Sequence, residues 1–291
     1  MTLFRLALSL AALALLPTLR ADQTGETNAE PTGETMADHE FRQISQRQVT
    51  LLAEAAKEGD KVDAEALRLQ AQSLVDEWER FLEANPNYAM GWAGYGYLLW
   101  KMDMRKESVA LLMKANLIDP NIALVKNEIG NYLAEEDKPL DAVNYYMAAI
   151  KLAPNEPLYH YQLGTLLYEC RDEFVRSGEW TRDAIDNAMH EAFRHATELA
   201  PDRIEFTHRY AESFADMPNP DWDAAVKVWG KVEIQARTPL ERQEARLQAA
   251  NLMIKQGNFD AAKVLISTVT EPGLQEPKQK LVALMAETPK K

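Results

Sequence analysis

The chain has little of what several classes of protein require. One cysteine among 291 residues can form no internal disulfide and no thiolate cluster for zinc or iron–sulfur. Only 32 basic residues stand against 45 acidic ones, for a formal net charge of −13, and no lysine–arginine cluster suits nucleic-acid phosphates. Glycine and proline are sparse, and no alternating β-branched run reaches strand length. With 46% apolar residues, we expect a globular protein that does not bind nucleic acid.

Residues 1–21 predict an export signal. Arg5 precedes an apolar stretch, residues 6–16, and cleavage is plausible after Ala21. The stretch is shorter than the ~20 residues that cross a bilayer as a helix, although an uncleaved anchor remains the alternative. Residues 22–38 have almost no apolar side chains and are predicted to be a flexible acidic linker. We therefore expect a periplasmic or secreted protein with no stable membrane span once the signal is removed.

Apolar residues recur at i, i+3, i+4 and i+7, which is the spacing of an amphipathic helix. The sequence also repeats over a longer interval, which prolines mark. Pro86, Pro120 and Pro154 each follow an amphipathic run at intervals of 34 residues, and Pro201 follows after 47. Proline cannot continue a helix, so each one marks the end of a helix and the start of the next unit.

The residues within each interval also align. The first interval reads Trp92-x2-Tyr95-Gly96-x2-Leu99 and then Ser108-x3-Leu112-x2-Ala115. This pattern resembles the tetratricopeptide repeat (TPR) family, a 34-residue helix–turn–helix unit. The resemblance implies an all-α, right-handed superhelical solenoid of antiparallel helix pairs. Small residues such as Gly96 let the paired helix approach, and large ones fill the space between pairs.

The resemblance also organises the rest of the chain. Residues 39–86 are predicted to be an N-terminal capping hairpin, and residues 87–270 about five TPR-like repeats. The third repeat carries an insertion, residues 171–182, that either lengthens a helix or forms a loop, with a break at Ser177-Gly178. Residues 271–291 are expected to form a C-terminal capping helix and a tail. Tight turns are predicted at Asp103, Asp137 and Gly257.

No catalytic or metal-binding constellation is evident. His190 and His195 are five residues apart, about 140° around a helix, whereas the zinc-protease motif needs four. Both are expected on the solvated surface, and His160 is expected to pack inside its repeat. Cys170 is expected to be a small buried side chain. We predict no catalytic residue, no metal and no cofactor.

The first helix of each pair is expected to line a concave groove rich in aromatic and amide side chains, which suit peptide binding. Glu205, Glu212 and Glu244 share its inward register. Few lysines or arginines face it, which disfavours a terminal carboxylate and favours a neutral, apolar or mildly basic segment. The predicted groove residues are Tyr97, Trp100, Asn127, Asn131, Tyr161, Thr165, Tyr168, His208 and Arg209.

Three functions follow from these features. The first is a non-enzymatic, exported scaffold or adaptor that binds a protein segment in the groove. The second is a structural repeat protein of the cell envelope that self-assembles. The third, ranked last, is an enzyme that uses the insertion of the third repeat.

Overall fold

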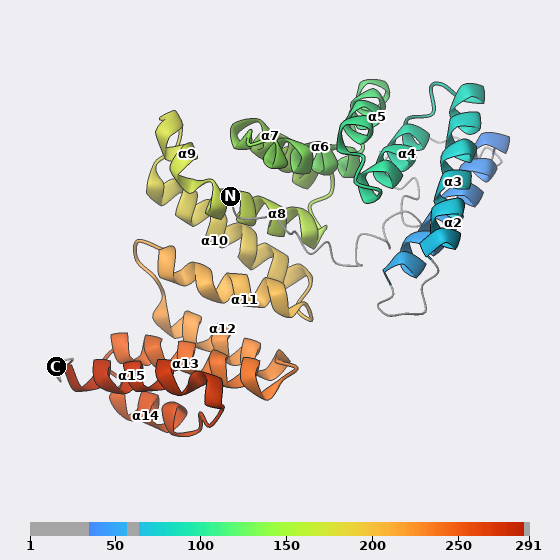
Figure 1. Ribbon diagram of the computed structural model, residues 1–291. Coiled ribbons are helices and arrows are strands. Elements are labelled where there is room, and N and C mark those ends of the chain that lie inside the picture. The colour runs from blue at the N-terminus through green and yellow to red at the C-terminus, as the bar shows by residue number, and fades with distance from the viewer. Residues whose placement is uncertain (1–34, 57–63, 288–291) are drawn as a thin grey trace, which may run out of the picture. The chain divides into compact units, whose positions relative to one another are not determined.

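A computed structural model describes residues 35–56 and 64–287. In these residues the chain forms the α-helices α2–α15 and two short 3-10 helices, with no strand (Figure 1). The all-α prediction is therefore confirmed for the described part of the chain. The predicted signal and most of the predicted linker lie outside it. The chain divides between Lys138 and Pro139 into two compact units, unit 1 (residues 1–138) and unit 2 (residues 139–291).

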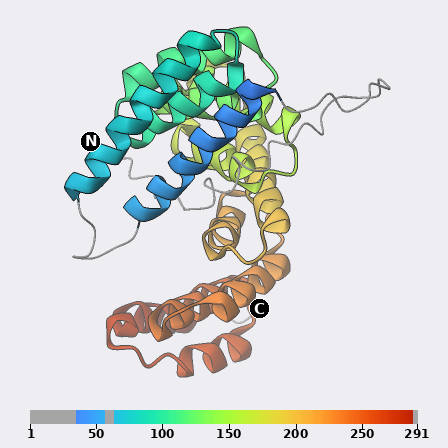
Figure 2. The same cartoon turned by 90° about the vertical axis from the view of Figure 1, so that its right-hand side faces the viewer.

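Unit 1 consists of consecutive helices that pack against one another, and Figure 2 shows the first two side by side. The first begins at Met36, so that it includes the last three residues of the predicted linker. Thr35 and Asp38 start it with a capping box in which each side chain accepts the other's backbone N–H at 3.1 Å. The helices are α2 (Met36–Ala55), α3 (Ala64–Ala84), α4 (Ala89–Lys101), α5 (Arg105–Ile118) and α6 (Ala123–Glu135).

Two glycines of α4 allow helices to pack closely on it from two sides. A Cβ atom at Gly94 would lie 2.9 Å from the Trp78 ring of α3, and one at Gly96 would lie 3.0 Å from Leu112 Cγ of α5. Both distances are shorter than ordinary carbon–carbon contacts of about 3.5–4.0 Å. The glycine of the repeat motif thus serves the α4–α5 pair, and Gly94 serves the preceding hairpin.

A buried glutamine joins the three N-terminal helices. Gln48 of α2 is fully buried; its amide nitrogen donates to the Gly94 carbonyl at 3.1 Å. Its amide oxygen accepts the indole N–H of Trp78 at 2.7 Å. Since Gln48, Trp78 and Gly94 lie on three different helices, the α2–α3 hairpin shares one polar and apolar core with α4.

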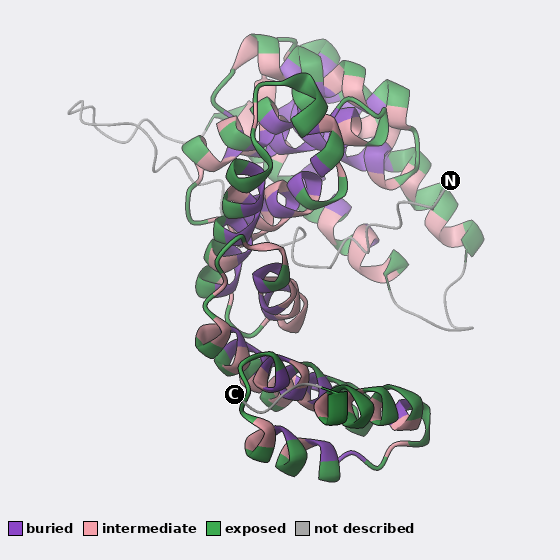
Figure 3. Ribbon diagram, turned by 90° about the vertical axis from the view of Figure 1, so that its left-hand side faces the viewer, coloured by how far each residue is buried: buried purple, intermediate pink, exposed green. Residues whose placement is uncertain are grey.

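Unit 2 also consists of consecutive helices that pack against one another, and its buried residues lie where neighbouring helices face one another (Figure 3). The last helix, α15, packs on α13 and α14. The helices are α7 (Pro139–Leu152), α8 (Pro157–Glu169), α9 (Arg171–Ser177), α10 (Arg182–Leu199), α11 (Ile204–Ser213), α12 (Trp222–Gln235), α13 (Pro239–Lys255), α14 (Phe259–Ser267) and α15 (Gln275–Glu287).

One hydrogen bond recurs at the start of two repeats. The indole N–H of Trp92 donates to the Pro86 carbonyl at 2.9 Å, and His160 Nε2 lies 2.8 Å from the Pro154 carbonyl. A carbonyl only accepts, so His160 donates with Nε2. Each donor lies six residues after its proline, and His160 is buried. The expected packing role of His160 is confirmed.

The predicted turns are confirmed by the backbone. Asp103, Asp137 and Gly257 have φ angles of 63°, 60° and 80°. This left-handed conformation is open to glycine and is tolerated by aspartate better than by most residues. These three tight connections between consecutive helices are therefore encoded locally.

The insertion of the third repeat forms a separate helix, α9, that ends at Gly178 with φ 79°. The predicted break is confirmed. The ring of Phe174 is fully buried, and Arg171 pairs with Asp186 at 2.8 Å and with Asp216 at 3.0 Å. The insertion is thus anchored on the unit by the buried Phe174 ring and by two ion pairs of Arg171.

The expectation that His190 lies on the solvated surface is wrong. His190 is 8% exposed, and its ring packs on Phe214 with a centroid separation of 4.5 Å. The Ser213 hydroxyl donates to the Tyr210 carbonyl, so His190 Nδ1 donates to Ser213 Oγ at 2.8 Å. Burial lowers the pKa of His190, which favours the neutral ring. His195, with its side chain 47% exposed, does lie on the surface.

Candidate functional site

The first helices of the repeats in unit 2 are α8, α11 and α13, and five of the predicted groove residues lie on the first two. Tyr161 is half-buried; its ring centroid lies 4.6 Å from that of Phe206 and 5.8 Å from that of Phe193. Burial raises the pKa of Tyr161, so the phenol stays neutral. Thr165 donates its hydroxyl to the Tyr161 carbonyl at 2.9 Å. Both side chains mainly support the helix packing.

Four further residues form a half-exposed cluster, which we call the inner patch: Tyr168, His208, Arg209 and Glu212. The Tyr168 side chain is 41% exposed, and the Arg209 guanidinium lies 4.3 Å from its ring centroid. Arg209 also pairs with Glu212 at 2.8 Å, and His208 Nδ1 lies 3.6 Å from the other oxygen of that carboxylate. Burial alone would raise the pKa of Glu212, but the hydrogen bonds from His208 and Arg209 hold it below its usual value. The patch therefore presents an aromatic ring and a neutralised ionic cluster.

A pocket opens beside His208, between α11, α12 and α13. Its apolar wall comes from Ile204, Trp229, Val232 and Ala245, and the His208 ring meets the Trp229 ring edge-on at 5.1 Å. The cavity holds about 200 Å³. Its polar rim consists of His208 and three glutamates, Glu205, Glu241 and Glu244. We call it the α11–α13 pocket.

The four predicted groove residues of unit 1 lie on α4 and α6 and are buried. Tyr97, Trp100, Asn127 and Asn131 are 1%, 2%, 0% and 5% exposed. The Tyr97 hydroxyl, the Trp100 indole nitrogen and the Asn127 amide oxygen have no hydrogen-bond partner among the described residues. These side chains therefore offer polar groups but almost no accessible surface.

A buried carboxylate accompanies them. Glu128 is 2% exposed and accepts a hydrogen bond from Asn131 Nδ2 at 3.1 Å. Burial raises the pKa of Glu128, an effect that Asn131 and the charge of Lys101 oppose. Burial lowers the pKa of Lys101, whose ammonium lies 5.1 Å from the Tyr97 ring centroid. The inward faces of α4 and α6 thus hold an ionisable cluster that sequence analysis did not identify.

The structure brings part of the predicted set together. Tyr168, His208 and Arg209 meet in the inner patch of unit 2, whereas the four predicted residues of unit 1 are buried within that unit. The pocket glutamates were missed as site residues, although Glu205 and Glu244 share the inward register. Their spacing was visible: Glu205 lies three residues before His208, and Glu241 lies three residues before Glu244.

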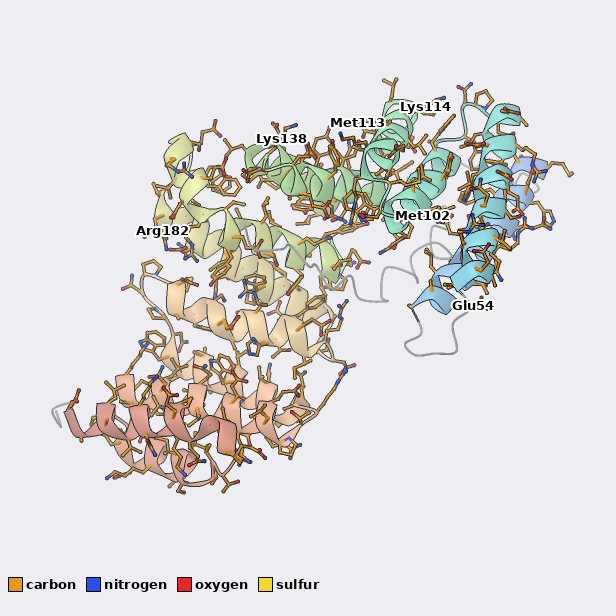
Figure 4. All side chains as sticks on the ribbon, viewed as in Figure 1. Glu54, Met102, Met113, Lys114, Lys138 and Arg182 are labelled. Carbon is orange, nitrogen blue, oxygen red and sulfur yellow. The ribbon has the colours of Figure 1, made fainter. Side chains whose placement is uncertain are left out.

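The described residues contain no group of three His, Cys, Asp or Glu side chains placed to hold a metal ion. Within residues 35–56 and 64–287, no helix combines the length and apolar character needed to cross a membrane. Cys170 is partly exposed at the junction of α8 and α9 and forms no disulfide. Exposed side chains such as Met113 and Lys114 project from α5 (Figure 4).

No family model and no curated protein matches the chain. Solved structures do match. YrrB, described as a TPR protein with an unusual peptide-binding site, has a TM-score of 0.55 at 15% identity, over 73% of this chain and 97% of YrrB. PilF from Pseudomonas aeruginosa has a TM-score of 0.58 at 15% identity, over 86% and 99%. PilW, a type IV pilus biogenesis factor, has a TM-score of 0.50 at 11% identity, over 83% and 99%. The chain therefore has the tetratricopeptide-repeat fold.

Proposed function

We propose that this protein is a non-enzymatic, exported scaffold that holds an extended segment of a partner protein against the first helices of its repeats. The observation that carries the proposal is the inner patch. It exposes the Tyr168 ring, with the partly buried guanidinium of Arg209 lying over it, and aromatic residues and arginine are enriched where binding energy concentrates in interfaces. The α11–α13 pocket, which shares His208 with the patch, adds a cavity next to this surface.

The neighbouring structures support this proposal at the level of the fold. YrrB is described as having a peptide-binding site, and PilW as a factor in pilus biogenesis. We infer by analogy that the present chain also works by binding other proteins, with no cofactor and no nucleic acid. No nucleophile with an activating base is evident in the sequence, which places an enzymatic function last.

Variants of the inner patch test the proposal. Tyr168→Ala and Arg209→Ala should each weaken capture of partner proteins from the source organism, because each removes one member of the Tyr168–Arg209 stacked pair. Ile234→Ala is the matched control: Ile234 is 84% exposed on α12, a second helix, and the change should leave capture intact. Partner binding that survives both patch variants, or that is lost equally in the control, would refute the assignment.

Export is part of the proposal and rests on residues 1–21. Expression in a bacterial host should yield a protein whose N-terminus follows Ala21, found outside the cytoplasm. Intact-mass measurement of the purified protein checks the cleavage. A full-length protein that stays in the cytoplasm would refute export while leaving the binding proposal untouched.

Self-assembly is the second candidate. Second helices α5, α12 and α14 expose large apolar side chains: Leu117 at 85%, Ile234 at 84% and Val264 at 65%. Single exposed apolar residues are common on monomeric proteins, so this candidate ranks below segment binding. Light scattering separates the two, since a monomer whose mass is independent of concentration would exclude self-assembly.

A further inference from the structure

The α11–α13 pocket has two chemically distinct parts. Its wall is apolar, and three of its members, Trp229, Val232 and Ala245, are at most 4% exposed and therefore fixed by packing. Its rim carries Glu205, Glu241 and Glu244 from α11 and α13. A side chain that fills such a cavity must combine an apolar stem with a polar end.

The rim charges are not equivalent. Glu205 is paired with Arg203, whose Nε donates to it at 2.8 Å. Glu241 accepts the backbone N–H groups of Arg237 and Thr238 at 2.9 and 3.2 Å, as the capping box of α13, and these bonds hold its pKa below the usual value. It therefore keeps its negative charge. Glu244 is exposed and has no ion pair among the described residues.

The cations on the same two helices each have a contact of their own: Arg242 donates to the Ala236 carbonyl at 3.5 Å, and the Lys255 ammonium lies 5.3 Å from the Trp222 ring centroid. Arg209 pairs with Glu212 and lies over Tyr168, and Arg246 pairs with Glu233 at 2.7 Å. Glu241 and Glu244 form no ion pair among the described residues, although the charge of Arg237 contributes to the lowered pKa of Glu241. The two carboxylates therefore leave negative charge on the rim, and Glu244 carries it without a paired cation. A carboxylate would be repelled there. A purely apolar side chain would partly desolvate both glutamates without giving them a partner.

We infer that the α11–α13 pocket is a specificity pocket for one basic side chain, arginine or lysine, of the partner segment. The inference rests on the proposed function and names the chemistry of its ligand. The methylene stem lies along Trp229 and Val232, and the cationic head reaches Glu241 and Glu244. The pocket and the inner patch share His208. The basic residue in the pocket therefore lies next to the part of the partner segment that contacts the inner patch.

Titration of the full chain with capped tripeptides tests the inference directly. The probes are acetyl-Ala-Arg-Ala-amide and acetyl-Ala-Gln-Ala-amide, which differ in charge. The reporter is the indole N–H signal of Trp229 in a ¹H–¹⁵N NMR spectrum, assigned by its absence in Trp229→Phe. We expect the arginine peptide to shift this signal saturably and the glutamine peptide to bind about tenfold more weakly, because it loses the ion pairs with both glutamates.

Three charge variants sharpen the test. Glu244→Gln should weaken the arginine peptide about two- to fivefold, and Glu241→Gln/Glu244→Gln about tenfold. Glutamine also closes a capping box, so the second change should preserve the start of α13. Glu276→Gln is the control, because it removes the same charge from α15, where the side chain is 78% exposed and lines no part of the pocket. The Glu276→Gln variant should bind the arginine peptide with the same affinity as the unmodified chain.

The inference is overturned if both peptides shift the Trp229 signal equally, or if the double variant binds the arginine peptide as well as the unmodified chain does. Capture of a partner that depends on Tyr168 and Arg209, together with equal tripeptide binding, would leave the proposed function standing and remove the pocket. If the pocket binds the arginine peptide selectively but the patch variants still capture every partner, the pocket assignment stands and the role of the inner patch is refuted.

Discussion

The glycine that allows helices of a pair to pack closely offers the sharpest test of how this sequence specifies its fold. In the third repeat, a Cβ atom at Gly164 of α8 would lie 2.8 Å from two ring carbons of Phe193 on α10. That is about 0.7 Å inside the ordinary lower limit of about 3.5 Å for carbon contacts. Phe193 is 1% exposed and its ring packs on Tyr161, so it has little room to move.

The expected cost of Gly164→Ala follows from two opposing effects. Overpacking a well-filled core costs about 1–3 kcal/mol. Replacing glycine by alanine inside a helix stabilises it by about 0.5–1 kcal/mol. The net loss of unfolding free energy is thus about 0–2.5 kcal/mol, with a central value of about 1 kcal/mol. Gly230 on α12 provides the control, because a methyl group added there would have no neighbouring atom within 4 Å, and Gly230→Ala should stabilise by about 0.5–1 kcal/mol.

Urea unfolding followed by circular dichroism at 222 nm measures both variants. Both glycines lie in unit 2, so the two changes act on the same unit and their midpoints can be compared directly. We expect the midpoint to fall for Gly164→Ala and to rise for Gly230→Ala, with unchanged slopes. Midpoints that rise equally in both variants would refute the claim that a small residue is required for the α8–α10 contact.

Three other perturbations test separate contacts. Gln48→Met should destabilise unit 1 by about 1–3 kcal/mol, because the buried Trp78 indole N–H loses its acceptor, and an unchanged urea midpoint would contradict this. Arg171→Met should lower the unfolding free energy by about 2–4 kcal/mol, because it leaves the Asp186 carboxylate, 5% exposed, with only the more exposed Arg182 as a partner. Thermal unfolding measures this loss, and a melting temperature that changes by less than about 1 °C would show that α9 is not anchored through the Arg171–Asp186 pair. Burial raises the pKa of Glu128 in the folded chain, so its contribution to stability is present at low pH and is lost as pH rises through that pKa. Glu128→Gln removes this loss and should therefore stabilise the chain more at pH 7 than at pH 4 in urea unfolding, whereas an equal effect at both pH values would refute the burial argument.

The repeat architecture could be predicted because each of its signals has a local cause. Proline ends a helix wherever it falls, and a residue such as Asp103 adopts the left-handed turn within its own pair. Thr35 and Asp38 have the spacing of a capping box, which also indicates the start of α2. This signal is weaker than the others, because the residue three positions after the N-cap is usually glutamate or glutamine rather than aspartate. Signals of this kind need only neighbouring residues.

The insertion shows where local reasoning ends. The break at Gly178 was predicted, because glycine readily adopts positive φ. A helix and a loop remained equally open before that break. What fixes α9 is the contact of Arg171 with Asp186 and Asp216, 15 and 45 residues further along the chain. Contacts between residues so far apart in sequence leave no periodic pattern.

In the candidate site, the direction in which a side chain points and its exposure to solvent are two different properties, although a repeat pattern does not distinguish them. Trp100 and Tyr168 occupy the same register, each 14 residues after the proline that opens its repeat, yet they are 2% and 41% exposed. Helical periodicity determines the direction in which a side chain points, but the neighbouring elements determine whether any of its surface remains accessible. A ligand needs both. The inner patch and the pocket rim satisfy both conditions, because Tyr168, Glu205 and Glu244 keep their inward register and leave polar or aromatic surface exposed.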